Sequence, residues 1–96
     1  MLRVEKLLWD TWNVDHIRRH GVTPQQVEEV CHRRHLVRQT HADRLLVIGT
    51  DQDNEMLSIV LSSQGASKYY VVTARPAGRK ERAAYRAFVA EGGNDV

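Results

Sequence analysis

Basic residues gather between positions 75 and 86, where an apolar stretch gives way to a helical pattern. The five are Arg75, Arg79, Lys80, Arg82 and Arg86. Arg79, Arg82 and Arg86 follow the spacing i, i+3, i+7, so they share one face of a helix. Cations at a helix N-terminus oppose the helix dipole at about 0.3–1 kcal/mol each, whereas an anion is favoured there. The cluster therefore indicates a phosphate-binding site, and a solvated face bridged by Glu81 is the alternative.

All five histidines lie in the first half of the chain, at His16, His20, His32, His35 and His41. Metal sites need two to four converging ligands, usually with help from cysteine or carboxylate. The chain has no HExxH motif and no cysteine pair, so we expect no metal site. His20 stands at the end of a predicted helix, where it can cap the last carbonyls. Because histidine titrates near neutrality, His20 is also a candidate general base.

Four aromatic side chains, Trp9, Trp12, Tyr69 and Tyr70, have the chemistry to stack on a nucleotide base. A small domain needs its large side chains inside, so core packing is the favoured interpretation. Neighbours on a strand point to opposite faces, and one of Tyr69 and Tyr70 must therefore face away from the core.

The length and composition are those of one small domain. The chain has 96 residues, of which 42% are hydrophobic and 27% charged, as in ordinary globular proteins. No apolar run approaches the roughly 20 residues that span a bilayer, and acidic residues near the N-terminus argue against a signal peptide. The single cysteine, Cys31, reads as a small buried hydrophobe and fits a reducing cytoplasm. We therefore expect a cytoplasmic protein without a membrane segment.

Two helices are predicted near the N-terminus, after a short strand within residues 2–9. Asp10 caps the first helix, which runs to about His20 and ends in a Schellman motif at Gly21. Thr23 and Gln26 form a capping box at the start of the second helix, whose buried stripe is the apolar set Val27, Val30 and Cys31.

The rest of the chain alternates between extended and turn-forming segments. Strands are predicted over residues 36–40, 44–50, 55–62 and 68–74. A closing helix follows from Arg79 to about Ala90 and packs on the sheet through Ala84, Tyr85, Phe88 and Val89. Short turns between strands favour antiparallel neighbours.

These elements define an α+β fold with two N-terminal helices, an antiparallel sheet of three to four strands and a C-terminal helix. We expect a single domain over residues 1–96, with its core at about 7–90 and a tail at 91–96. Helices cover one face of the sheet, and the open face beside the cationic helix suits a strand of RNA.

Several motifs, in matching order and spacing, resemble the BrnT family of toxins. They are Trp9-Asp10, His20-Gly21-Val22, Glu28-Glu29, Arg44 opening a strand that ends in Gly49, Thr73-Ala74-Arg75, Arg79-Lys80-Glu81-Arg82, and Tyr85. The resemblance covers about residues 7–88. The chain departs from the family at His16 and Arg19, where Asn and Lys are usual, and at Ala77-Gly78, where a larger pair is usual.

The resemblance implies a RelE-like fold and a ribonuclease that uses neither metal nor cofactor and stops translation by cutting RNA. It also implies a ribbon-helix-helix antitoxin as partner, and it leaves a homodimer and a toxin–antitoxin heterotetramer both open. In metal-free cleavage the ribose 2′-hydroxyl attacks the adjacent phosphate, and preorganised arginines stabilise the charge that develops.

Site roles follow from this chemistry. The predicted catalytic residues are His20, Arg44, Arg75, Glu81, Arg82 and Tyr85, and the predicted RNA-binding residues are Arg75, Arg79, Lys80, Arg82 and Arg86. Proton transfer is assigned to His20 or Glu81, with Tyr85 as orienting group or acid. The alternative function is a catalytically inactive module that binds antitoxin or nucleic acid. A metal-dependent nuclease is least supported, because the acidic segment 51–55 has the composition of a solvated turn.

Overall fold

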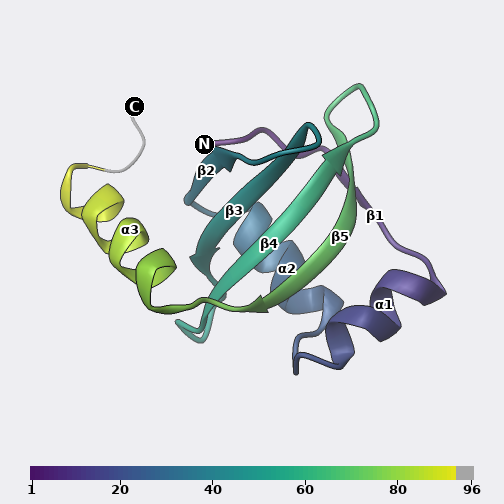
Figure 1. The fold of residues 1–96 in the computed structure, drawn as a ribbon, viewed down its shortest axis with the longest axis horizontal. Helices are drawn as coiled ribbons and strands as arrows, with labels where there is room; N and C mark the ends of the chain where they lie inside the picture. The colour runs from purple at the N-terminus through teal and green to yellow at the C-terminus, as the bar shows by residue number, and fades with distance from the viewer. Residues whose placement is uncertain (93–96) are drawn as a thin grey trace.

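A computed structural model describes residues 1–92, in which five strands and three helices follow one another (Figure 1). The strands are β1 (Lys6–Leu8), β2 (His35–Gln39), β3 (Arg44–Thr50), β4 (Met56–Ser63) and β5 (Lys68–Pro76). The helices are α1 (Thr11–Arg18), α2 (Pro24–Cys31) and α3 (Arg79–Ala90). Of the predicted tail, residues 93–96 lie outside the described range.

The strands form one sheet in the order β1-β5-β4-β3-β2. The consecutive strands β2 to β5 pair antiparallel, which confirms the predicted meander. The predicted number of three to four strands is wrong, and the sheet is not purely antiparallel, because β1 pairs with β5 in parallel. β1 has three residues and its partner is about sixty residues away in the sequence, so its sequence pattern carries no information about the direction of pairing.

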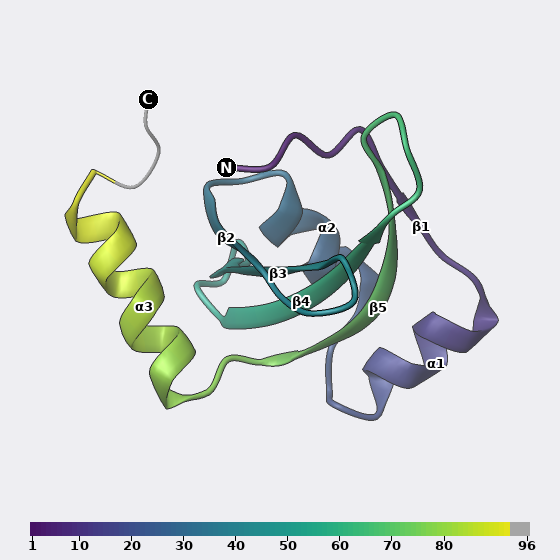
Figure 2. The same cartoon turned by 45° about the horizontal axis from the view of Figure 1, so that its top comes forward.

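Helices α1 and α2 pack on one face of the sheet and enclose the core (Figures 1 and 2). The helices and their connection contribute Ile17, Val22, Val27, Val30 and Cys31, and the three longest strands contribute Val47, Leu57, Ile59, Leu61, Val71 and Ala74. Cys31 is 1% exposed within this core, which confirms that it is a small buried hydrophobe, and its burial raises the pKa of the thiol to about 12.

Capping boxes start both N-terminal helices. At α2, Thr23 Oγ1 accepts from the Gln26 N–H and the Gln26 side chain accepts from the Thr23 N–H, as predicted. At α1, the Asp10 carboxylate accepts from the Asn13 N–H and the Asn13 amide oxygen accepts in return. The fully buried Asn13 also donates to the Val71 carbonyl at 3.1 Å, so it ties α1 to β5.

The aromatic residues divide between the core and the surface. Trp9 is half-buried and donates from Nε1 to Glu28 at 2.9 Å, which links the start of α1 to α2. Core packing is the wrong expectation for Trp12, which is 60% exposed because α1 buries only one narrow stripe. Tyr69 is buried and Tyr70 is only half-buried, which confirms that the pair point to opposite faces.

The turn between β3 and β4 is held by a buried carboxylate. Asp51 is 2% exposed and accepts from Gln26 Nε2 and from the N–H groups of Asp53 and Glu55 at 2.8–2.9 Å. Burial alone would raise the pKa of Asp51, but these hydrogen bonds outweigh it and lower the pKa. The solvated turn expected here is therefore wrong for Asp51, which fastens the turn to α2.

His35, at the start of β2, is fully buried and makes two hydrogen bonds. Its Nδ1 donates to the Arg33 carbonyl at 2.7 Å, and its Nε2 accepts from the Leu2 N–H at 3.0 Å. Burial lowers the pKa of His35, so the ring is neutral at neutral pH. Its two bonds fix both the corner between α2 and β2 and the first residues of the chain.

Helix α3 lies apart from α1, on the other side of the molecule in both ribbon views (Figures 1 and 2). Four side chains were expected to pack on the sheet, but only Tyr85 is buried, whereas Ala84, Phe88 and Val89 are half-buried. The face of the sheet opposite the core is therefore only partly covered. Within residues 1–92, the helices are too short or too polar to cross a membrane.

Candidate functional site

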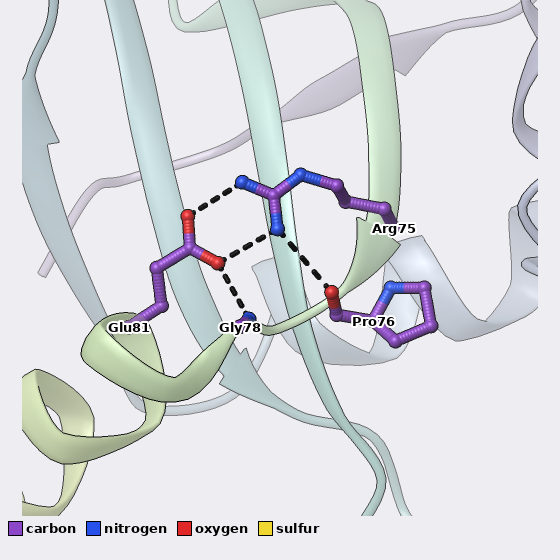
Figure 3. Close-up of polar contacts among 4 residues, drawn as sticks. All are labelled: Arg75, Pro76, Gly78 and Glu81. Atoms are coloured by element: carbon purple, nitrogen blue, oxygen red, sulfur yellow. Dashed lines mark hydrogen bonds and ion pairs between the residues drawn. The ribbon is translucent and has the colours of Figure 1, made fainter.

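The junction between β5 and α3 holds a two-pronged ion pair (Figure 3). Arg75 Nη1 and Nη2 donate to Glu81 Oε1 and Oε2 at 2.8 and 2.7 Å. Glu81 Oε1 also accepts from the Gly78 N–H at 2.8 Å, and Arg75 Nη1 donates to the Pro76 carbonyl at 3.3 Å. A planar guanidinium paired in this way is fixed in orientation as well as in position.

Local sequence explains why the pair forms. Pro76 ends β5, and Gly78 begins α3 in an extended conformation. Glu81 is the third residue of the helix, where a carboxylate can bind the free N–H at the helix start and is favoured by the dipole. The turn of the chain then carries Glu81 back over the end of β5, where it meets Arg75.

The ion pair changes the charge state of Glu81. Hydrogen bonds from Arg75, opposed by burial and helped by the Gly78 N–H, lower the pKa of Glu81 from 4.5 to about 2. The same contact raises the pKa of Arg75. Glu81 is therefore ionised at neutral pH, and a carboxylate with so low a pKa is a weak proton acceptor.

Ser58 lies beneath this pair and was not singled out by its sequence. It stands opposite Arg75 in the β4–β5 register and is 2% exposed. Its hydroxyl is close enough to help lower the pKa of Glu81. Even so, Ser58 Oγ forms no hydrogen bond of good geometry, and it is the one buried side-chain polar atom within residues 1–92 of which this is true. Strand alternation placed Ser58 on the polar side of β4, but could not show that the start of α3 covers it.

The remaining basic residues of α3 separate into two groups. Arg79 and Lys80 are exposed at the start of the helix. Arg82 and Arg86 line a cleft between α3 and the β3–β4 turn, together with the buried Tyr85. The structure thus does not gather all the predicted phosphate-binding residues at one point.

The cleft has two adjoining parts, of about 370 and 330 Å³. Its basic residues come from the corner between α2 and β2 and from α3, and its apolar wall comes from β4 and α3. We call it the arginine cleft and define it by Arg33, Arg34, Met56, Arg82, Tyr85 and Arg86. Arg33 and Arg34 escaped sequence reasoning, because they follow α2 and lie about fifty residues from the α3 arginines in sequence.

Two predicted catalytic residues lie elsewhere. His20 follows α1, and its ring packs edge-on against that of His16, with 5.5 Å between the ring centroids. Both ribbon views show α1 and α3 on different sides of the molecule (Figures 1 and 2). Arg44 opens β3 at the end of the sheet away from α3. Arg44 shares a sheet face with Ile48, the residue that pairs with Ser58 beside the ion pair. Arg44 lies about 13 Å from Ile48 along β3, so it is far from the ion pair.

No grouping of three or more histidine, cysteine, aspartate or glutamate side chains suited to a metal occurs within the described part of the chain. His20 makes no side-chain hydrogen bond to the last carbonyls of α1 in that range, so the predicted cap is not formed. Near α3 the structure brings together several arginines, the Glu81 carboxylate and the Ser58 hydroxyl, with Thr50 and Asn54 on the wall of the cleft.

Fold and site define a class: a small α+β domain with two helices on one sheet face and an arginine-rich C-terminal helix beside the other. No protein-family model matches the chain, and comparison with curated proteins finds no match. It is similar to the crystal structure of the Brucella abortus ribonuclease toxin BrnT, with a TM-score of 0.64 and 25% identity over 77% of this chain and 97% of that chain. The chain is BrnT-like, which confirms the resemblance read from its motifs.

Proposed function

We propose that this chain is the RNA-cleaving toxin of a toxin–antitoxin pair. The structural similarity to a ribonuclease toxin supports this function, and it extends over nearly the whole of that toxin. The observation that carries the proposal is the Arg75–Glu81 pair, which presents a guanidinium in a fixed orientation at the edge of an open sheet face. A ribbon-helix-helix antitoxin encoded next to this gene is the expected partner.

In the proposed reaction, the ribose 2′-hydroxyl attacks the neighbouring phosphate without a metal. The 2′-hydroxyl gives up its proton to water as its oxygen bonds to phosphorus, and the bond between that phosphorus and the 5′-oxygen breaks. The 5′-oxygen takes a proton from water as it leaves, and a 2′,3′-cyclic phosphate remains. Arg75 stabilises the negative charge on the phosphoryl oxygens, and Arg79 and Arg82 bind the phosphates on either side. Because Arg75 is already oriented, little reorganisation accompanies the transition state.

Glu81 acts in this proposal as a positioning residue rather than as the base. Its low pKa makes it a poor proton acceptor, but its ionised carboxylate holds Arg75 by two hydrogen bonds. Tyr85 is 8% exposed and anchors α3. Arg44 binds a phosphate farther along an RNA strand laid on the open sheet face.

A second candidate is a module that binds antitoxin or nucleic acid without cleaving it. One observation favours it: His20, the histidine assigned to proton transfer, lies with α1 on the side away from α3 (Figure 1). Under this function the arginines bind phosphate or carboxylate and no bond is broken.

Cleavage of RNA by the pure protein in EDTA separates the two functions. We expect wild type to cut RNA with metal chelated, and Arg75→Ala to reduce kcat by about 100-fold or more, as loss of one charge-stabilising donor does elsewhere. Arg18→Ala on α1, where the side chain is 74% exposed, is the matched control and should cleave as wild type does. Binding of RNA without cleavage by wild type would establish the inactive module instead.

A further inference from the structure

The arginine cleft does not include the Arg75–Glu81 pair, and its Arg33 and Arg34 have no role in the reaction proposed above. It lies at the end of the sheet where β3 ends and β4 begins, with α3 as one wall. The corner between α2 and β2 supplies Arg33 and Arg34 to the second part of the cleft. Its volume of about 370 and 330 Å³ in two adjoining parts is in the range of sites that bind small ligands.

The cleft carries a strong positive charge. Four guanidinium groups line it, and within residues 1–92 no carboxylate does. Among residues 1–92, none of Arg34, Arg82 and Arg86 takes part in an ion pair. Arg33 makes one long hydrogen bond, to the Thr50 carbonyl at 3.5 Å. The charges of the cleft are therefore available to an anion.

The nearest buried acid does not neutralise these charges. Asp51 is close enough for Arg33 to lower its pKa, but Arg33 is the least of the causes. The Asp51 carboxylate is already occupied by Gln26 and by two backbone N–H groups. Arg33 thus keeps its donors for another acceptor.

The backbone that carries Arg33 and Arg34 is held rigidly. The Arg33 carbonyl accepts from the buried His35 ring at 2.7 Å. A Cβ on Gly49 would lie 3.3 Å from the Arg34 carbonyl oxygen and 3.1 Å from a methyl group of Val30, so any larger residue there would press on this corner. A corner fixed in this way places its two arginines opposite α3 before any ligand arrives.

We infer that the arginine cleft binds the phosphate backbone of single-stranded RNA beside the scissile phosphate, with Arg33 and Arg34 facing Arg82 and Arg86. This inference rests on the proposed function. A planar guanidinium can donate two parallel hydrogen bonds to two oxygens of one phosphate. A cluster of positive charges suits a polyanion such as RNA. Arg82 stands one helical turn from the Arg79 end of α3, so one RNA strand can run from Arg75 into the cleft. The Met56 and Tyr85 wall gives the ribose an apolar surface.

Salt-dependent RNA binding tests the inference. The probe is a short fluorescent RNA with 2′-O-methyl groups, which removes the nucleophile, titrated between about 50 and 200 mM salt. The variant Arg33→Gln/Arg34→Gln should bind about tenfold more weakly at the lowest salt, and the slope of log K against log salt should fall by about 1.4, or 0.7 for each lost phosphate contact. With cleavable RNA, the same variant should raise KM and leave kcat unchanged.

Two further variants make the result specific. Arg18→Gln/Arg19→Gln removes the same charge from α1 and should leave the slope as in wild type. Arg33→Lys/Arg34→Lys should keep the slope and lose only part of the affinity, because lysine keeps the charge but cannot bind in a planar, two-pronged way. This variant also covers the case in which the glutamine variant does not fold.

Unchanged affinity and slope in the Arg33/Arg34 glutamine variant would overturn the inference, as would an equal loss in the α1 control. Loss of antitoxin binding alone would also overturn it, because the cleft would then be a protein interface. If wild type binds RNA through the cleft but never cleaves it, the cleft is still an RNA-binding site and the proposed cleavage fails. If wild type binds no RNA at all, both fail.

Discussion

At the scale of single residues, the Arg75–Glu81 pair shows how one contact serves both stability and function. Arg75 is 45% exposed and Glu81 19% exposed, so solvent screens the pair and its net contribution is modest. The two-pronged geometry and the added bond from the Gly78 N–H make it stronger than an ordinary surface pair. Because the pair joins β5 to the first turn of α3, it fixes the start of that helix.

Replacement of Glu81 by glutamine should lower the free energy of unfolding at pH 7 by about 1–2 kcal/mol, after allowance for screening. The folded-state pKa of Glu81 is depressed from 4.5 to about 2. Its stabilisation is therefore complete above pH 4.5 and is lost as the pH falls toward 2. Urea unfolding of wild type and Glu81→Gln at pH 7 and pH 3 should show the difference narrowing at the lower pH.

A suitable control is Glu5→Gln, because Glu5 makes an ion pair with Arg3 in which both side chains are mostly exposed. We expect no measurable change there. A difference between wild type and Glu81→Gln that is the same at both pH values would show that the pair does not depress the pKa of Glu81.

At this scale the sequence predicts which residue types lie on α3, but not which side chains bind one another. The spacing of Arg79, Arg82 and Arg86 placed them on one helix, and the helix is there. That Arg75 would be bound to Glu81 depends on where α3 starts relative to β5, which no local pattern contains. Ser58 escaped for the same reason, since its burial comes from a helix that follows it by about twenty residues.

At the scale of elements, the corner between α2 and β2 packs closely against β3 at Gly49. Gly49 on β3 faces His35 on β2 across the register. A Cβ on Gly49 would stand 3.1 Å from the His35 Cβ and 3.1 Å from a methyl group of Val30. Backbone and a fully buried valine cannot both move aside cheaply. The close packing of α2 on β3 therefore depends on the absence of a side chain at Gly49.

Gly49→Ala should lower the free energy of unfolding by about 1–3 kcal/mol, the usual cost of overpacking a core. The midpoint of urea unfolding, followed by circular dichroism, measures this change. Because the substitution displaces the Arg34 backbone, it should also weaken RNA binding at the arginine cleft while leaving the Arg75–Glu81 pair intact. An unchanged unfolding midpoint would mean that α2 can shift without loss.

Elements with strong local signals were predictable. Capping residues located the start of α2, and the Schellman motif at Gly21 is present, with the Val22 N–H donating to the Ile17 carbonyl at 3.2 Å. The strands β3 to β5 were found within two residues of their bounds, because alternation and turn residues mark them. The parallel pairing of β1 with β5 and the burial of Asp51 against α2 were not predictable, because both depend on contacts between segments that are distant in the sequence.

At the scale of the whole molecule, stability is distributed unevenly. The core lies between the sheet and the helices α1 and α2. α3 stands on the other side (Figure 2) and contributes a single buried side chain, Tyr85. Its remaining ties to the sheet are the Arg75–Glu81 pair and the half-buried residues of its inner face.

Native-state hydrogen exchange should therefore show α3 opening at a lower free energy than the sheet. The hydrogen-bonded backbone amides of residues 83–90 should exchange at least several-fold faster than those of β3 and β4 at the same pH. Tyr85→Ala should accelerate exchange in α3 further and leave the exchange in β3 and β4 nearly unchanged. Equal exchange free energies in α3 and the sheet would show that the helix opens only with the core.

The parallel pairing of β1 with β5 bears on how the chain folds as it leaves the ribosome. Lys6 pairs with Lys68, so the first strand has no partner until most of the chain has been made. The antiparallel meander can close by local steps, whereas this last pairing joins segments about sixty residues apart in the sequence. β1 therefore waits for β5, and the sheet is completed only once β5 has been made. The arginines of α3 follow β5 directly, so they are added to a sheet that is just closing.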